Sequence, residues 1–270
     1  MDKYFKINRK LWDNLTNIHI GSEFYDVDGF RNGKSTLPNI EIEEVGSVAG
    51  KSLLHLQCHF GQDTLCWARL GAKVTGVDFS QKSIDQANML TQELEFDAEF
   101  ICSDLYKLTG CLDKKYDIIY TSSGVLNWLP DMGRWAETIS HFLKPGGIFY
   151  IHEFHPVFFL FDDEQNTQTP TLRYPYFNSD MPFDLVYNRD YADPDAEIEN
   201  ASYEWFHGLG EIVTSLIEAG LHIEFLHEFN YCHHNLHPLL TQGDDGLWRY
   251  TGLDGGLPLM FSIRTIKKEL

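Results

Sequence analysis

Residues 53–80 constrain the fold more than any other part of this 270-residue chain. The apolar run 53–56 is typical of a short buried strand, and 57–61 has the length of a turn. Apolar residues then recur with helical spacing over 64–70, and a second buried strand over 74–78 ends in an aspartate. This order of strand, turn, helix and strand predicts a βαβ unit with parallel strands.

The βαβ geometry brings polar groups to one edge of the sheet. Its helix begins at the carboxyl end of the first strand, where unpaired N–H groups and the positive end of the helix dipole face a crevice. Asp78 ends the neighbouring strand, where an acidic side chain can accept hydrogen bonds from a ribose diol. The stretch therefore predicts an adenosine-type cofactor. The alternative is a packed crossover in which Asp78 only caps the next helix.

The turn is poor in glycine. Dinucleotide-binding folds use G-x-G-x-x-G, whose glycines let the backbone approach a pyrophosphate. Gly61 is the only glycine in the turn, residues 57–61. A ligand without phosphates, packed against larger side chains, suits this turn better.

Strands and helices alternate through the rest of the chain. Apolar runs predict strands over 98–102, 116–121, 147–153, 221–229 and 259–266, and helical spacing predicts helices over 4–20, 84–94, 131–143 and 207–219. Ser80 is a good N-cap for the helix that follows it. We also expect a short helix within 39–50 and loops over 21–38 and 242–256.

We expect one domain with four regions. Residues 1–50 form an N-terminal cap, 51–155 the cofactor-binding core, and 207–270 a C-terminal helix and final hairpin. Residues 156–206 are rich in proline and aromatic residues and predict an inserted β-rich lid, with strands over 172–177 and 183–189.

Composition narrows the partners and the compartment. The chain has 21 Lys and Arg against 40 Asp and Glu, a formal net charge of −19, which argues against nucleic acid or an anionic membrane as a partner. Its five cysteines are dispersed without a C-x-x-C pair, which predicts reduced thiols, no zinc site and a cytoplasmic location. No signal peptide or membrane-spanning run is expected.

Four short motifs occur in order. They are GVDFS (76–80), SDL (103–105), YDIIY…LNWLPD (116–131) and LKPGG (143–147). Together they resemble class I S-adenosylmethionine-dependent methyltransferases of the small-molecule branch, with HLQCHFG (55–61) as a variant of the family's D-x-G-x-G-x-G motif. The resemblance implies a Rossmann-like, mostly parallel seven-stranded sheet with helices on both faces and an antiparallel last strand.

The resemblance also implies a cofactor, S-adenosyl-L-methionine, and roles for individual residues. Gln57, His59 and Gly61 would wrap its methionine part. Asp78 would hold the ribose hydroxyls beside Phe79 and Ser80, and Asp104 would accept from the adenine amino group between Ser103 and Leu105. Thr121 or Ser122 would face the methionine part or the substrate.

Methyl transfer from a sulfonium is mainly a matter of alignment and exclusion of water, and a general base helps only with a hydroxyl or protonated amine acceptor. Candidates for that base are His152, Glu153 and His155, at the carboxyl end of the fifth strand. HEFH is not the H-E-x-x-H zinc motif, so no metal is expected. The sequence predicts a small-molecule acceptor but specifies neither its identity nor the oligomeric state.

Two other hypotheses stay open. A protein of this fold that binds S-adenosylmethionine or a nucleoside without catalysis would also suit the altered turn. An NAD-type oxidoreductase would suit the βαβ unit and Asp78, although the glycine-poor turn argues against it.

Overall fold

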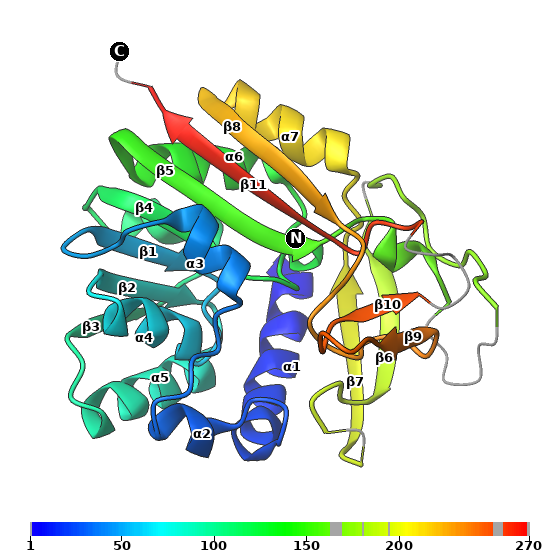
Figure 1. Cartoon of the computed structure of the whole chain (residues 1–270). Coiled ribbons are helices and arrows are strands. Elements are labelled where there is room, and N and C mark those ends of the chain that lie inside the picture. Colours follow the sequence, from blue (N-terminus) through cyan, green and yellow to red (C-terminus); the bar gives the residue numbers. More distant parts are fainter. Residues whose placement is uncertain (1, 163–168, 180, 194, 251–255, 269–270) are drawn as a thin grey trace.

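The structure is a computed structural model, and it describes residues 2–162, 169–179, 181–193, 195–250 and 256–268. Its centre is a seven-stranded sheet in the order β3-β2-β1-β4-β5-β11-β8 (Figure 1). The strands are β1 (Ser52–Leu56), β2 (Lys73–Asp78), β3 (Ala98–Cys102), β4 (Tyr116–Thr121), β5 (Leu143–Phe154), β8 (Leu221–Phe229) and β11 (Met260–Lys267). The five strands from β3 to β5 are parallel, and β11 runs antiparallel to both β5 and β8. The predicted fold class is confirmed.

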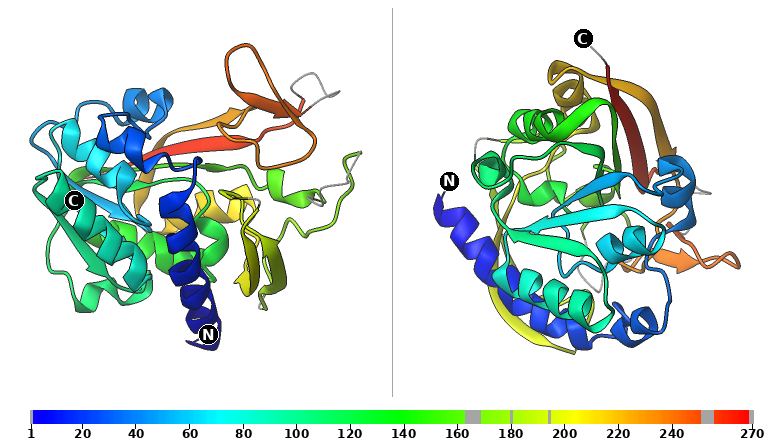
Figure 2. Two further views of the ribbon diagram at one scale, coloured as in Figure 1. Left: turned by 90° about the horizontal axis from the view of Figure 1, so that it is seen from below. Right: turned by 90° about the vertical axis from the view of Figure 1, so that its left-hand side faces the viewer.

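Helices cover both faces of this sheet (Figure 2). They are α3 (Asn39–Val45), α4 (Gln62–Arg69) and α5 (Gln81–Glu93) on one face, and α6 (Met132–Phe142) and α7 (Leu209–Glu218) on the other. Successive strand residues enter opposite cores: Leu53 packs on the side of Trp67, and Leu54 on the side of Trp135. Burial on both faces explains why these strands read as continuous apolar runs.

The N-terminal helix α1 (Asp2–Gly21) lies between the main sheet and a two-stranded hairpin, β6 (Phe183–Arg189) and β7 (Glu197–Glu204) (Figure 1). The Asn8 side chain donates to the Tyr203 carbonyl at 2.7 Å and accepts from the Tyr203 N–H at 2.9 Å. Leu11 and Leu15 pack against Ile198 of β7. Helix α1 therefore ties the hairpin to the carboxyl edge of the sheet.

Three expectations about the connecting segments were wrong or incomplete. Residues 172–177 form no strand, because only an isolated bridge joins Leu172 to Phe161, whereas the strand expected at 183–189 is β6. The expected loop 21–38 contains α2 (Val27–Arg31). The expected loop 242–256 includes β10 (Trp248–Tyr250), which pairs with β9 (Leu240–Gln242), while 251–255 lie outside the described residues. Short 3-10 helices complete the list: η1 (Leu105–Gly110), η2 (Leu126–Trp128) and η3 (Phe158–Leu160).

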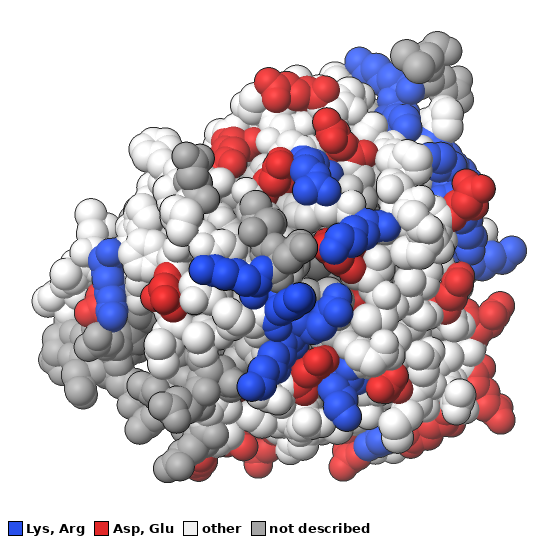
Figure 3. Space-filling model, turned by 180° about the vertical axis from the view of Figure 1, so that it is seen from behind, with Lys and Arg blue, Asp and Glu red and all other residues white. Residues whose placement is uncertain are grey.

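The surface charge is unevenly spread. Figure 3 shows Lys and Arg side chains gathered near the middle of the back face, with acidic side chains along one edge. Across the described ranges, no helix combines the length and apolar character needed to cross a bilayer. That nucleic acid is not a partner stays a prediction.

Candidate functional site

The turn after β1 keeps a glycine-like backbone almost without glycine. Gln57 has φ +57°, His59 has φ +50° and Gly61 has φ +84°. A positive φ costs a side-chain-bearing residue about 1–2 kcal/mol, and such strain concentrates at functional sites. In the resembled motif these three positions are the glycines. Two of the three side chains differ from the glycines of that motif, but the backbone keeps the left-handed conformation.

Gly61 itself has little steric freedom. A Cβ atom there would lie 2.7 Å from the Phe100 ring of β3 and 3.0 Å from Ala87. Gly61 also serves as the N-cap of α4. Its role is therefore to let the turn pack on β3 and α5 while α4 begins at the edge of the sheet.

Asp78 lies beside this turn, at the carboxyl end of β2. Its Oδ2 accepts from the His59 N–H at 2.9 Å, and its Oδ1 accepts from the Ser80 N–H at 2.8 Å. The residue is 8% exposed, and burial raises the pKa of its carboxyl to about 7, against the lowering effect of these backbone donors. Each oxygen keeps further lone-pair capacity for a ligand hydroxyl.

The other expected residues lie at the ends of the neighbouring strands. The Ser103 N–H donates to the Asp78 carbonyl at 2.9 Å, which places Ser103 and Asp104 beside Asp78. Asp104 caps η1 through the Tyr106 N–H, and the Leu105 side chain is buried below it. Phe79 is half-buried, and Ser80 caps α5 as predicted.

Two buried oxygens at this edge lack a hydrogen-bond partner among the described residues. They are Gln57 Oε1, just after β1, and Thr121 Oγ1, at the end of the adjacent strand β4. Gln57 uses its Nε2 to donate to the Val125 carbonyl at 3.0 Å, and the Ser122 hydroxyl lies 3.3 Å from His55 Nε2. A buried polar atom without a partner is costly, so this pair is suited to a ligand that brings a donor such as an ammonium group.

A buried chain of polar groups joins helix α1 to the turn. His19 Nδ1 lies 2.7 Å from His59 Nε2, and His19 Nε2 lies 3.0 Å from Asp190 Oδ2. His59 Nδ1 lies 3.0 Å from the Ser83 hydroxyl, which meets Thr16 at 2.7 Å. Burial is the main reason that the pKa of His59 lies well below its usual range, and the neighbouring His19 lowers it further. The His59 ring is therefore neutral.

The expected base candidates fall on two faces of β5. His152 is buried with its Nδ1 3.0 Å from Glu41 Oε1, and its Nε2 has no partner among the described residues. Glu153 is also buried, and its two oxygens accept the N–H groups of Gly124, Val125, Leu126 and Phe154. His155 Nδ1 accepts from the Val157 N–H, while its Nε2 lies 3.0 Å from Glu228.

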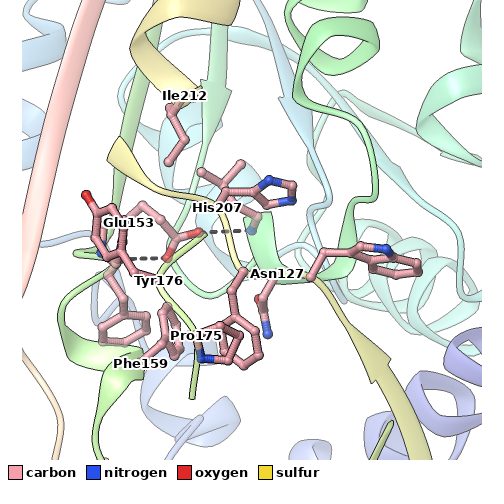
Figure 4. A pocket seen from close by; sticks show the side chains of 12 residues that line it. Asn127, Glu153, Phe159, Pro175, Tyr176, His207 and Ile212 are labelled. Atoms are coloured by element: carbon pink, nitrogen blue, oxygen red, sulfur yellow. Dashed lines mark hydrogen bonds between the residues drawn. The ribbon is translucent and has the colours of Figure 1, made fainter. Parts of the chain in front are cut away.

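A pocket opens on the Glu153 face of the sheet, between η2 and the end of β7 (Figure 4). It holds about 370 Å³ of empty space, including the part open to solvent. Its wall is mostly aromatic and apolar, and is formed by Leu126, Asn127, Glu153, Phe154, Pro156, Phe159, Pro175, Tyr176, Trp205, Phe206, His207 and Ile212. The pocket is therefore separate from the Asp78 edge and lies on the lid side of the loop after β4.

Sequence reasoning missed several of these residues. His19 and Asp190 are far apart in the chain, and neither belongs to a motif. Asn127 lies inside the quoted LNWLPD segment but was given no role. Trp12 of α1 contacts the rings of both His59 and Trp128, with centroids 5.2 and 5.3 Å apart.

No group of three metal-ligating side chains suited to a cation occurs in the part of the chain that the structure describes. The five cysteines, all within that part, are free thiols.

Comparison with known proteins agrees with this geometry. Residues 54–151 match the family described as a methyltransferase domain. A ubiquinone biosynthesis O-methyltransferase of Coxiella burnetii is 33% identical over 106 residues, which cover 39% of this chain and 44% of that protein. A protein of the same name from Chromobacterium violaceum is 26% identical over 147 residues, covering 54% of this chain and 59% of that one. The crystal structure of an S-adenosylmethionine dependent methyltransferase from Mesorhizobium loti superposes with a TM-score of 0.57 at 18% identity, covering 87% of this chain and 99% of that chain.

The fold is thus the Rossmann-like fold of class I methyltransferases. Within it, residues 54–151 are a methyltransferase domain, as the motifs indicated. The chain spans 44% and 59% of the lengths of the two curated relatives.

Proposed function

We propose that this protein transfers a methyl group from S-adenosylmethionine to a small-molecule acceptor. The observation that carries the proposal is the placement of Asp78 and Asp104 at the carboxyl ends of the adjacent strands β2 and β3, beside a turn with glycine-like backbone. Carboxyl ends of parallel strands are where such folds bind nucleotides. The methyltransferase-domain match over 54–151 supports the same activity.

The residues at this edge suit the parts of that cofactor. Asp78 has lone pairs for ribose hydroxyls, with Phe79 and Ser80 beside it, and Asp104, between Ser103 and Leu105, can accept from the adenine amino group. The unpartnered oxygens of Gln57 and Thr121 suit the ammonium of the methionine part, which His59, Gly61 and Ser122 adjoin. A sulfonium brings no phosphate, so the bulky turn is no obstacle.

The bound cofactor supplies a methyl group on a sulfonium, which leaves as a neutral thioether. The protein's contribution is alignment and exclusion of water. Trp12 of α1 covers the turn through its contact with the His59 ring, and β7 holds α1 in place. The nucleophile of the acceptor gains the methyl group, and its proton, where it carries one, is released to solvent.

We propose positioning roles for all three candidates, because His152 lies on the face of β5 opposite the pocket that Glu153 lines. Glu41 orients the His152 ring through Nδ1. The four N–H donors around Glu153 occupy its carboxylate in holding the loop after β4. His155 joins the start of the lid to Glu228 on β8.

Isothermal titration with S-adenosylmethionine and its demethylated product tests the proposal. We expect micromolar binding of both, and at least a tenfold loss in Asp78→Ala, because the ribose hydroxyls lose their acceptor. The exposed Asp97→Asn serves as the control, with unchanged binding. No heat with either compound would overturn the proposal.

The other two hypotheses have their own readouts. NADH bound more tightly than the demethylated product would favour an oxidoreductase. Cofactor binding without transfer of labelled methyl to any acceptor in a metabolite extract would favour a non-catalytic binding protein. The dispersed free cysteines support a reducing, cytoplasmic location, and the net charge of −19 supports a small molecule over nucleic acid as acceptor.

A further inference from the structure

We infer that the pocket between η2 and the end of β7 binds the methyl acceptor, and that this acceptor is an uncharged planar ring compound with a hydrogen-bond donor. This inference rests on the proposed methyl transfer. It goes further by naming the class of acceptor and the residues that select it.

The pocket walls favour a flat apolar body. Phe159, Tyr176, Trp205 and Phe206 contribute rings, and Ile212 of α7 closes the inner end (Figure 4). Aromatic side chains bind planar ligands by stacked and edge-to-face contacts. An extended polar chain would make few favourable contacts with these apolar walls, and its own polar groups would be left without hydrogen-bond partners.

The polar groups in the wall select against charge. Glu153 is the acidic residue that lines the pocket, and backbone N–H groups already occupy its carboxylate. His207 is bound through Nε2 to the Leu129 carbonyl at 2.6 Å and has Glu211 3.1 Å from Nδ1. An ammonium in this pocket would lose its water without gaining an available carboxylate.

Asn127 supplies an acceptor atom for a donor on the ligand. Asn127 Oδ1 is buried and has no partner among the described residues, while its Nδ2 donates to Glu204 Oε2 at 2.7 Å. The Trp205 N–H also donates to the Asn127 carbonyl at 2.8 Å. Because the bond to Glu204 fixes the side-chain amide, Oδ1 is a preset acceptor for a ring hydroxyl or N–H.

The pocket adjoins the cofactor edge through a single loop. Gln57 of the turn donates to the Val125 carbonyl, and Trp128 Nε1 donates to the Gly124 carbonyl at 3.0 Å while its ring meets Trp12. Residues 122–129 therefore form one wall of each site. A ring held on one side of this loop can present its reacting atom at the sheet edge, as displacement at a methyl carbon requires.

Fluorine NMR titration of the full chain, without cofactor, tests this inference with three probes. They are 6-fluoro-2-naphthol, its methyl ether, which lacks the donor, and 4-fluorophenethylammonium. We expect the naphthol to bind about tenfold more tightly than the ether, as one hydrogen bond to a buried acceptor implies, and the ammonium to bind weakest. Ammonium binding equal to that of the naphthol would overturn the inference.

Two variants locate the site. Asn127→Leu should abolish the preference for the naphthol over the ether, whereas Asn88→Leu, on the distant helix α5, should retain it. The preference is a ratio within one variant, so partial loss of stability does not imitate the effect. A preference that survives in Asn127→Leu would refute the assignment. If the ring probes bind as expected but titration with S-adenosylmethionine shows no heat, the ring-binding site is supported and the proposed methyl transfer is refuted.

Discussion

His19 of the N-terminal helix and His59 of the turn after β1 meet ring to ring, with Nδ1 and Nε2 2.7 Å apart. Asp190 binds the far side of His19, so one buried imidazole connects the β6–β7 region to the motif that resembles a cofactor-binding turn. Binding of a cofactor at the Asp78 edge should therefore depend on the position of α1 as well as on the sheet.

Removing this link should destabilise the protein. His19→Leu loses two hydrogen bonds and removes the partner of His59 Nε2 and of Asp190 Oδ2, so the free energy of unfolding should fall by about 2–4 kcal/mol in urea titration. His222→Leu, at an exposed position on β8, should change it by less than about 0.5 kcal/mol. Equal values for the two variants would show that the link contributes nothing.

Binding of the demethylated cofactor should depend on pH through Asp78. The pKa of its carboxyl is raised to about 7, so below pH 7 the cofactor-free protein carries a proton there. Ribose hydroxyls donate to the charged form, so the association constant should rise about tenfold per pH unit between pH 5 and 7 and then level off. Asp78→Asn should bind weakly and without this rise. Binding that weakens as the pH increases would contradict the assignment.

The same raised pKa has a consequence for folding. In the unfolded chain this carboxyl titrates near 3.8, so the folded state holds the proton more tightly. The Asp78 contribution to stability should be fully present below pH 3.8 and lost as the pH rises through about 7. Comparing the pH dependence of unfolding for the parent protein and Asp78→Asn measures it, and a smaller decline is expected in the variant.

Glycine substitutions should separate backbone strain from side-chain function. Glu95 has φ +56° and is exposed, so Glu95→Gly should raise the free energy of unfolding by about 0.5–1 kcal/mol. Gln57→Gly relieves similar strain but loses the bond to the Val125 carbonyl, so its gain should be smaller and its cofactor affinity lower. Thermal unfolding and cofactor titration measure both effects. An equal gain in both variants with unchanged cofactor affinity would argue against a role for the Gln57 amide.

Glu153→Gln should be costly despite its small change in shape. Four backbone N–H groups now donate to the two carboxylate oxygens of Glu153. The amide of Gln replaces one of these oxygens with an NH₂ group, which faces N–H donors and cannot accept their bonds. We therefore expect the free energy of unfolding in urea to fall by about 2–4 kcal/mol. Acceptor binding should weaken too, because the loop after β4 lines the pocket. The exposed Glu137→Gln provides the comparison. A Glu153→Gln variant as stable as Glu137→Gln would refute the positioning role.

Most of the fold could be predicted from the chain because the information is local. Burial on both sheet faces makes β1, β2 and β4 continuous apolar runs, and Ser80 marks the start of α5 by capping it. The carboxyl-edge placement of Asp78 and Asp104 followed from parallel strand order. The lid was harder, since proline-rich aromatic segments have no clear period, and the strand expected at 172–177 does not exist.

The residues alone thus determined a parallel sheet with two aspartates at one edge. They could not show that Gln57 and His59 adopt the backbone of absent glycines, because φ depends on the hydrogen bonds from Cys58 to Val77 and from His59 to Asp78. They also could not pair His19 with Asp190 or place Asn127 against Glu204, whose separations in sequence are 171 and 77 residues. Such contacts form only after the chain folds, so tertiary structure alone decided how the site closes and what its pocket accepts.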